Sequence, residues 1–350
     1  MKRITLGGLV LLAVVALAVL GGRTQSASAK PQAGSLVGTG STFVFPLVSK
    51  WIPAVDNALG IKLTYSATGS GAGIAQVTAR TVDFGASDAP LSPDQATACK
   101  SCVVIPWGLA GMSVPYNVPG LNGRLRLNGT VLANIFLGTI TNWNASAIKA
   151  LNPKLKLPDL PIKPVYRSDG SGSTYAFTNY LSAVSPQWKS KVGTNTSVNF
   201  PTGTGARGSS GVAGVVKSTE GALTYVDAAY SIQNKFQFAL IQNRAGGFAT
   251  PGVRGVTAAL SQLPAKVTNL SQLKIVDPPK SAGKRAYPIS TFTYVIVPTN
   301  SGDKAADLRK LIYWTVTSGQ KFGPPLYFVP LPKAVNGFVY REIKKIQSGA

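Results

Sequence analysis

The sequence predicts an α/β fold with largely parallel sheets, on two observations. First, short segments rich in β-branched residues alternate with segments whose apolar residues recur at helical spacing. Second, three Gly/Ser-rich stretches, at residues 38–43, 68–73 and 170–173, follow or adjoin predicted strands and open predicted helices. Such alternation is typical of parallel sheets, whose ligands bind beyond the carboxyl ends of the strands.

The expected elements follow one another along the chain. Strands are predicted at residues 61–67, 82–88, 103–118, 162–166, 222–226 and 291–297. Helical spacing is found at residues 44–55, 74–80, 131–136, 177–184, 308–316 and 335–343. Pro53 is expected to kink or shorten the first helix, Pro106 to break the long strand, and Thr130 to cap the third helix. Residues 203–214 are expected to be flexible, and residues 240–285 to form a surface elaboration.

The composition is that of a strongly basic globular protein. There are 35 Lys+Arg against 12 Asp+Glu, which gives a formal net charge of +23, and there is no histidine. A positive field of this size attracts anions and acidic surfaces but does not specify a fold. The basic residues are scattered singly and no nucleic-acid motif occurs, so we do not expect nucleic-acid binding. A chain of 350 residues is long enough for two domains.

Residues 1–29 have the parts of a secretory signal peptide. Two basic residues near the start precede the apolar residues 6–20, and Ala27 and Ala29 fit the small-x-small cleavage pattern. We therefore expect export and cleavage after Ala29. No lipid anchor is expected, because no cysteine lies near the cleavage point. An uncleaved anchor helix is the alternative, although the apolar stretch is short for spanning a bilayer.

Cys99 and Cys102 are the only cysteines of the sequence. In an exported chain a local disulfide is favoured. A redox-active pair is the alternative, but that interpretation requires the motif on a strand-to-helix turn. Here the pair lies between a helix-like stretch and a strand. Because so small a ring removes little unfolded-state entropy, we expect the disulfide to pin a loop more than to stabilise the fold.

The three Gly/Ser-rich stretches predict an anion site. A helix N-terminus leaves unpaired backbone N–H groups and the positive end of the helix dipole, and both favour anions. The groups expected to converge are the amides of Thr42, Phe43, Gly172 and Ser173 and the hydroxyls of Thr42, Ser70, Ser171 and Ser173. Arg167 would add a bidentate guanidinium. Any one of these loops alone would equally suit an ordinary helix cap.

Four motifs together resemble one known family. They are residues 38–43 (GTGSTF), 81–92 (TVDFGASDAPLS), 137–143 (LGTITNW) and 167–173 (RSDGSGS). The chain resembles the periplasmic phosphate-binding proteins that serve phosphate ABC transporters, over nearly all of its length beyond the leader. The resemblance implies a two-lobed periplasmic-binding-protein fold of the class II type, with the ligand in the cleft between the lobes. By this analogy, lobe I comprises residues 30–117 and 289–350, and lobe II comprises residues 118–288.

The resemblance also implies the ligand, its contacts and the partners. By this resemblance the ligand would be inorganic phosphate, with no cofactor and no metal, and the protein would be a periplasmic monomer that delivers it to the permease subunits of the transporter. The implied phosphate contacts are Thr42, Phe43 (through its N–H), Ser70, Asp88, Arg167, Ser171, Gly172 and Ser173. Asp169 is interpreted as orienting Arg167. Two departures from the family pattern are Ser173 in place of a frequent threonine, and Gly71-Ala72 in place of a serine-glycine pair.

Asp88 has a distinct role in this hypothesis, because an ionised carboxylate only accepts hydrogen bonds. Phosphate still carries at least one proton near neutral pH and can donate it to Asp88. Sulfate carries none, so it would leave the buried carboxylate unpaired and repelled. We therefore expect Asp88 to select phosphate over sulfate. A helix-cap or loop acid is the alternative interpretation of this residue.

An enzyme is the rival class of function, and the sequence disfavours it. There is no histidine base, no metal-ligand cluster, no Gly-x-Ser-x-Gly elbow and no Walker loop. Ser271 and Lys274 match a Ser-x-x-Lys pattern, but a chance match to so short a pattern means little in a chain of this size. We therefore expect no catalysis, including phosphate-ester hydrolysis. An exported phosphate scavenger or adhesin-like protein without a transporter would use the same site, and the sequence leaves that alternative open.

Overall fold

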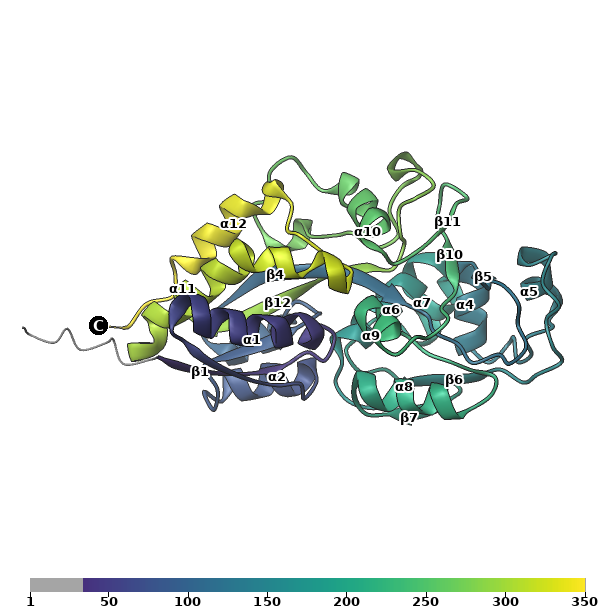
Figure 1. The fold of residues 1–350 in the computed structure, drawn as a ribbon, viewed down its shortest axis with the longest axis horizontal. Helices are drawn as coiled ribbons and strands as arrows, with labels where there is room; N and C mark the ends of the chain where they lie inside the picture. Colours follow the sequence, from purple (N-terminus) through teal and green to yellow (C-terminus); the bar gives the residue numbers. More distant parts are fainter. Residues whose placement is uncertain (1–33, 350) are drawn as a thin grey trace, which may run out of the picture. The chain divides into compact units, whose positions relative to one another are not determined.

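The computed structural model describes residues 34–349, and the predicted leader and its cleavage site lie outside these residues. The helices, drawn in Figure 1, are α1 (Phe45–Leu59), α2 (Ser70–Thr78), α3 (Pro93–Cys99), α4 (Gly129–Phe136), α5 (Ser146–Leu151), α6 (Gly172–Val184), α7 (Pro186–Lys191), α8 (Gly208–Ser218), α9 (Ala228–Gln233), α10 (Val253–Ala259), α11 (Ala305–Val316) and α12 (Lys333–Ile343). Short 3-10 helices lie at Leu260–Gln262, Leu270–Gln272, Lys280–Ala282, Gly302–Lys304, Ser318–Phe322 and Pro324–Leu326.

The strands are β1 (Ser35–Gly40), β2 (Lys62–Ser66), β3 (Phe84–Ser87), β4 (Cys102–Ser113), β5 (Arg126–Leu127), β6 (Lys163–Arg167), β7 (Thr204–Ala206), β8 (Ala222–Leu223), β9 (Val226–Asp227), β10 (Leu240–Gln242), β11 (Phe248–Ala249), β12 (Ser290–Pro298) and β13 (Phe328–Val329). They form three sheets. The largest has seven strands in the order β13-β4-β12-β3-β1-β2, with β9 paired to β4. The two smaller sheets have the orders β11-β10-β5 and β7-β6-β8.

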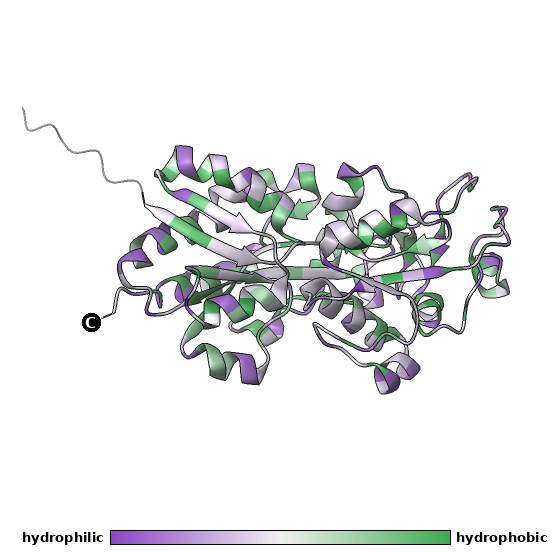
Figure 2. Cartoon of the chain, turned by 90° about the horizontal axis from the view of Figure 1, so that it is seen from below, coloured by the Kyte–Doolittle hydropathy of each residue, from purple (hydrophilic) through white to green (hydrophobic). Residues whose placement is uncertain are grey.

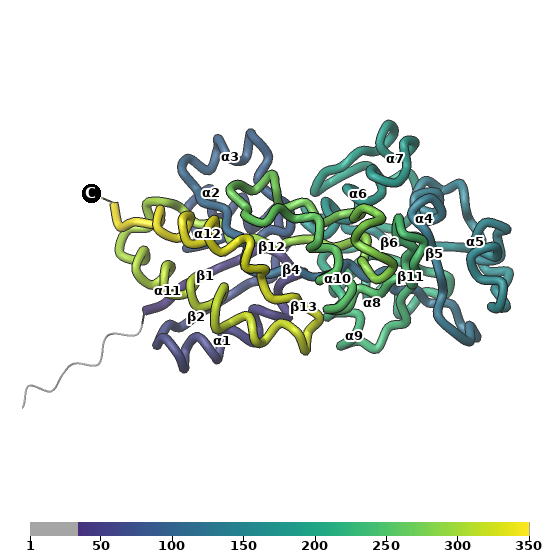
Figure 3. The backbone as a smooth tube through the Cα atoms, turned by 90° about the horizontal axis from the view of Figure 1, so that it is seen from above, coloured from purple at the N-terminus to yellow at the C-terminus, as the bar shows by residue number. Residues whose placement is uncertain are grey.

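The predicted α/β class is confirmed, but the largest sheet is mixed rather than largely parallel. β1 runs parallel to β2 and β3, as helix-connected strands do. In contrast, β12 runs antiparallel to both β3 and β4, and β13 is antiparallel to β4. The late strands β12 and β13 return to a sheet that the first third of the chain has begun. Helices α1 and α11 lie on one side of this sheet and α2 on the other (Figures 1 and 3).

The long strand β4 links the large sheet, with its helices, to the two smaller sheets. Beyond Ser113 the chain continues through bridges between Pro115 and Phe238 and between Tyr116 and Leu223. The returning chain leads into β12, whose Ser290 pairs with Gly111 of β4. We call the part built on the large sheet the first lobe, and the part built on the two small sheets the second lobe.

Each lobe is organised around buried aromatic side chains. In the first lobe Trp51 of α1 packs edge-on against Trp107 of β4, with ring centroids 5.3 Å apart. In the second, Phe177 of α6 stacks on Tyr225 at 4.3 Å. These rings are fully or almost fully buried, and hydrophobic residues gather inside while hydrophilic ones lie on the outer helices (Figure 2). The apolar residues that recur at helical spacing in the sequence are therefore those that face the core.

Two prolines do not interrupt their elements as expected. Pro53 lies inside α1, which runs on to Leu59 and ends at the left-handed Gly60. Pro53 is exposed, so the backbone hydrogen bond that it removes is on the solvent side. Pro106 lies within the continuous strand β4, where the pairing register shifts between Thr293 and Tyr294 on the opposite strand. This β-bulge lets the strand pass a residue without an N–H.

Two helix starts and one stretch predicted to be flexible also differ from the prediction. α2 begins at Ser70 rather than at residue 74, because its glycines let it pack closely on β1. A Cβ on Gly73 would lie 2.6 Å from the Cα of Gly40. α4 is capped by Asn128, whose Oδ1 accepts from Val131 N at 2.8 Å, and not by Thr130. Most of the stretch 203–214, expected to be flexible, is strand β7 and the first turns of α8.

Candidate functional site

Arg167 lies at the end of β6, in the second lobe, and is 4% exposed. Its Nε donates to Asp169 Oδ1 at 2.7 Å, and its Nη2 donates to Asp169 Oδ2. The amide of Gly208 also donates to Asp169 Oδ1, at 3.0 Å. Burial alone would raise the pKa of Asp169, but the bonds and charge of Arg167 outweigh it and lower that pKa below its ordinary value. The carboxylate thus fixes one edge of the guanidinium and leaves Nη1 for another contact.

The remaining Nη1 of Arg167 reaches the first lobe. It donates to Thr42 Oγ1 at 3.0 Å, and the same hydroxyl lies 2.8 Å from Ser209 Oγ in the first turn of α8. Thr42 belongs to the first Gly/Ser-rich loop, just before α1. The hydroxyl of Thr42 therefore joins three segments that are distant in the sequence, since it contacts both Arg167 and Ser209.

Asp88 directly follows β3 and is 2% exposed. Ser41 Oγ donates to its Oδ1 at 2.6 Å, and its own amide donates to Ser70 Oγ at 3.4 Å. Burial raises the pKa of Asp88 to about 6, against the opposing influence of the nearby hydroxyls and of the positive charge of Arg167. Near neutral pH the side chain is therefore mostly ionised, yet only a modest change in its surroundings would protonate it.

The second and third Gly/Ser-rich loops touch one another across the lobes. A Cβ on Gly172, at the start of α6, would lie 2.5 Å from Asp88 N and 2.7 Å from Ser70 Oγ. In addition, Gly71 N donates to Gly170 O at 2.8 Å. Beside this contact, a cavity of about 370 Å³ is lined by Asp88 together with residues of α6 and β12.

The N-terminus of α6 carries both satisfied and unsatisfied groups. Ser171 Oγ caps the helix by accepting from Thr174 N at 3.2 Å. Ser173 Oγ, by contrast, is buried and has no hydrogen-bond partner in the part of the chain that the structure describes. The amides of Gly172 and Ser173 belong to the first turn and have no acceptor within the helix. Donors that are buried without partners normally require one, so this helix start is suited to an acceptor-rich anion.

The predicted contacts therefore gather in one place, with some of their groups already paired. Thr42, Ser70 and Asp88 come from the first lobe, and Arg167 and the start of α6 come from the second. The amide of Phe43, one of the predicted donors, gives its hydrogen bond to Ser41 Oγ at 3.1 Å.

Sequence reasoning missed several neighbours of these residues. Ser41 holds Asp88, Ser209 contacts Thr42, and the Gly208 amide holds Asp169. Thr293 of β12 has a buried hydroxyl with no hydrogen-bond partner among residues 34–349, and it is near enough to influence Asp88. Ser41 lies within the motif at residues 38–43, so the sequence alone could have placed it at the site. The other three come from segments without any spacing signal that ties them to the site.

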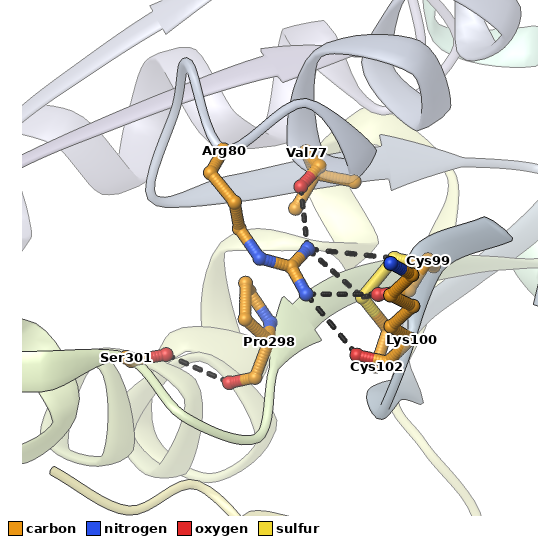
Figure 4. The surroundings of a disulfide bond; sticks show 7 residues. All are labelled: Val77, Arg80, Cys99, Lys100, Cys102, Pro298 and Ser301. Atoms are coloured by element: carbon orange, nitrogen blue, oxygen red, sulfur yellow. Dashed lines mark hydrogen bonds between the residues drawn. A yellow bond between two sulfur atoms is a disulfide. The ribbon is translucent and has the colours of Figure 1, made fainter. Parts of the chain in front are cut away.

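The predicted disulfide between Cys99 and Cys102 is confirmed. Figure 4 shows it next to Arg80, whose Nη2 donates to the carbonyl of Cys99 at 2.8 Å, and whose Nη1 donates to the carbonyl of Val77. The pair closes the turn from α3 into β4. Within residues 34–349 no helix is long and apolar enough to cross a membrane. No cluster of metal-ligating side chains occurs in that range either.

Comparison with known proteins identifies the family. Residues 25–318 match the model of the PBP superfamily domain. The phosphate-binding protein PstS of Xylella fastidiosa (strain Temecula1) is 39% identical over 312 residues, which cover 88% of this chain and 85% of that protein. The chain belongs to the PBP superfamily and, within it, to the PstS family. PstS of Haemophilus influenzae is 36% identical over 307 residues, 87% of this chain and 91% of that protein.

A solved structure supports the fold of this PstS-family chain. The high-affinity periplasmic phosphate-binding protein PfluDING, bound with phosphate, has a TM-score of 0.71 to it at 20% identity. The alignment covers 88% of this chain and 93% of that one. The two-lobed periplasmic-binding-protein fold expected from the sequence motifs is thereby confirmed, as is the family resemblance itself.

Proposed function

We propose that this protein binds inorganic phosphate between its lobes and delivers it to the permease subunits of a phosphate ABC transporter. The observation that carries the proposal is the convergence of Arg167, Thr42 and the open amides of α6 on the surroundings of one buried acid, Asp88. Nearly all of these groups donate hydrogen bonds, which suits an oxyanion. The names of the PstS relatives, which are phosphate-binding proteins, agree with this choice of ligand.

In this proposal the phosphate contacts are Thr42, Phe43 (through its N–H), Ser70, Asp88, Arg167, Ser171, Gly172 and Ser173. The Ser173 hydroxyl would obtain the partner that it lacks. Asp169 holds Arg167 without touching the ligand. Asp88 accepts the proton that phosphate retains, and this would reject sulfate, which has no proton to give. A site built around a particular hydrogen bond typically rejects a ligand that lacks it by ~10⁴ or more.

The same proposal includes the lobe boundaries and the cellular setting. Lobe I would comprise residues 30–117 and 289–350, and lobe II residues 118–288. Just beyond β4, Pro115 and Tyr116 pair with Phe238 and Leu223 of the second lobe. These bridges support a boundary between the two lobes near residue 117. The protein would act as a periplasmic monomer, freed of its leader after Ala29, with no lipid anchor and no catalytic activity.

Isothermal titration with phosphate, arsenate and sulfate tests the proposal. Phosphate should bind, arsenate should compete because it shares the shape and the proton of phosphate, and sulfate should bind far more weakly. Arg167→Ala should weaken phosphate binding by at least about a hundredfold, because bonds from a charged donor each contribute ~1.5–3 kcal/mol. An unchanged phosphate affinity in this variant, or equal affinity for the three anions, would refute the assignment of the site.

A further inference from the structure

A cavity lined by basic side chains lies in the second lobe, where β5 is next to β10 and α5 (Figures 1 and 3). Its volume is about 330 Å³. We call it the β5 pocket and define it by Arg124, Arg126, Asn152, Lys154 and Leu240, which line it. None of the residues proposed to contact phosphate lines this cavity, and neither does any carboxylate.

The two arginines of the β5 pocket are held in place by aromatic rings. The Cζ of Arg124 lies 4.8 Å from the ring centroid of Phe238, and that of Arg126 lies 5.0 Å from the ring centroid of Phe248. Stacking engages the face of a guanidinium and leaves its N–H edge available. Between and beyond the arginines, Leu125 and Leu127 are buried. The two cations therefore project from the same side of an extended segment, about 7 Å apart along the backbone.

The third cation is brought to the pocket by a fixed turn. Asn152 is 4% exposed, and its side chain bonds to both backbone groups of Arg126, with Oδ1 2.9 Å from the amide nitrogen and Nδ2 2.8 Å from the carbonyl oxygen. Its Nδ2 also donates to Ile148 O of α5 at 2.9 Å. This clamp joins the end of α5 to β5, and two residues later the chain presents Lys154 to the pocket. The backbone segments that carry Arg126 and Lys154 are thus fixed relative to one another by the side chain of Asn152.

The three cations of the β5 pocket are exposed, and their side chains have no salt-bridge partner within residues 34–349, as is true of most lysines and arginines of this basic chain. Arg167 is paired with Asp169 and Arg244 with Asp277, and Arg80 is bonded to backbone carbonyls. Within residues 34–349, no salt bridge and no side-chain hydrogen bond is made by Arg124, Arg126 or Lys154. Three positive charges with open donors surround one cavity, so an anion of matching charge would be bound without displacing any internal partner.

We propose that the β5 pocket binds a diphosphate group. Each arginine fork can bind one phosphoryl group in a bidentate manner, so the two arginines provide one fork for each of two linked phosphoryl groups. Lys154 supplies a third charge toward an anion that carries three or four negative charges. The cavity lies at the lower end of the size range of small-molecule sites and exceeds the needs of a single phosphate. The shared chemistry is the diphosphate, as a free inorganic ion or as the end of a nucleoside diphosphate.

Titration of the full protein, saturated beforehand with inorganic phosphate, with sodium diphosphate and separately with ADP tests this inference. Saturation occupies the proposed phosphate site, so any further binding reports a second site. If only diphosphate binds, the ligand is the inorganic ion. If ADP binds, with or without binding of diphosphate, the pocket recognises the diphosphate group of a nucleoside diphosphate. The absence of binding by both overturns the proposal.

Paired variants locate the binding. Arg124→Gln/Arg126→Gln should weaken diphosphate binding by at least about tenfold, which corresponds to ~1.4 kcal/mol. Lys189→Gln/Lys191→Gln removes the same charge from α7, outside the pocket, and should change binding less than about twofold, because charges that do not touch the anion are screened by salt. Arg124→Lys/Arg126→Lys keeps the charge but loses the forks, and should also bind more weakly than the native protein. Equal losses in the α7 control and the pocket variant would overturn the proposal, and unchanged affinity for inorganic phosphate shows that the variants are folded.

Discussion

Asp88 is the residue on which ligand selection depends in the proposed mechanism. It is buried, it receives a hydrogen bond from Ser41, and it lies within the electrostatic reach of Arg167. The pKa of about 6 reflects a balance in which burial outweighs those favourable contacts. A carboxylate in this state accepts a proton from a ligand at little cost, and it repels a ligand that has none.

Asp88→Asn should therefore erode discrimination against sulfate more than it weakens phosphate binding. The amide keeps the size of the side chain, removes the negative charge and offers an N–H to a fully deprotonated oxyanion. Calorimetric affinities for both anions give the ratio directly, and a fall of at least about tenfold, or ~1.4 kcal/mol, is expected. A ratio equal to that of the native protein would remove Asp88 from the selection of ligands.

The same group predicts how selectivity depends on pH. Because its pKa is raised to about 6, Asp88 is ionised above that pH and protonated below it. Protonation gives the carboxyl group a donor, so sulfate should compete more effectively as the pH falls from about 7 to about 5. Competition titrations across this range measure the change, with Asp88→Asn as the control that should show a much flatter profile. Constant sulfate exclusion down to pH 5 would contradict this role.

At the scale of elements, periodicity identified most of the framework. Buried side chains recur at helical spacing in α1, α11 and α12, so their existence was predictable. The start of α2 was not, because Gly71 and Gly73 have low helix propensity and tertiary packing overrides it. For the same reason the sequence could not reveal that β4 passes Pro106, since the bulge depends on a partner strand almost two hundred residues away.

The candidate site was predictable to the extent that its groups lie within local motifs. The loop containing Thr42 and the run from Arg167 to Ser173 each carry a helix-start signal, and family resemblance joined them. Ser209 and Thr293 lie in segments that only the tertiary fold brings to the site. Contacts between the lobes leave no repeating pattern in the sequence, so the spacing of residues could not predict them.

The turn between α3 and β4 is an element whose disulfide has a limited energetic role. Lys100 and Ser101, inside the ring, have positive φ angles of 43° and 63°, and Arg80 separately bonds the carbonyls of Cys99 and Lys100. A ring of this size is expected to contribute about 2 kcal/mol or less. Cys99→Ser/Cys102→Ser should lower the free energy of unfolding by that amount in urea titrations. Phosphate affinity should stay within about twofold of the native value, a change of less than ~0.5 kcal/mol in binding free energy. A larger loss would contradict a purely local role of the disulfide.

At the scale of the whole molecule, the decisive feature is how closely the lobes meet at Gly172. A side chain there would overlap the amide of Asp88 and the hydroxyl of Ser70. Both atoms belong to the first lobe, whereas Gly172 begins α6 of the second. The lobes can form this contact only because the residue has no Cβ, and the same contact surrounds the proposed phosphate site.

Gly172→Ala should therefore hold the lobes apart without removing any donor, since alanine keeps the backbone N–H. We expect phosphate affinity to fall by at least about tenfold, or ~1.4 kcal/mol, and the decrease in radius of gyration on adding phosphate, measured by small-angle X-ray scattering, to be reduced. Gly214→Ala is the matched control. A Cβ there meets nothing within 4 Å, so the substitution should only favour helix α8. If the Gly172 variant binds phosphate and compacts as the native protein does, the contact seen between Gly172 and Asp88 does not govern closure, and the phosphate contacts must form in a more open arrangement of the lobes.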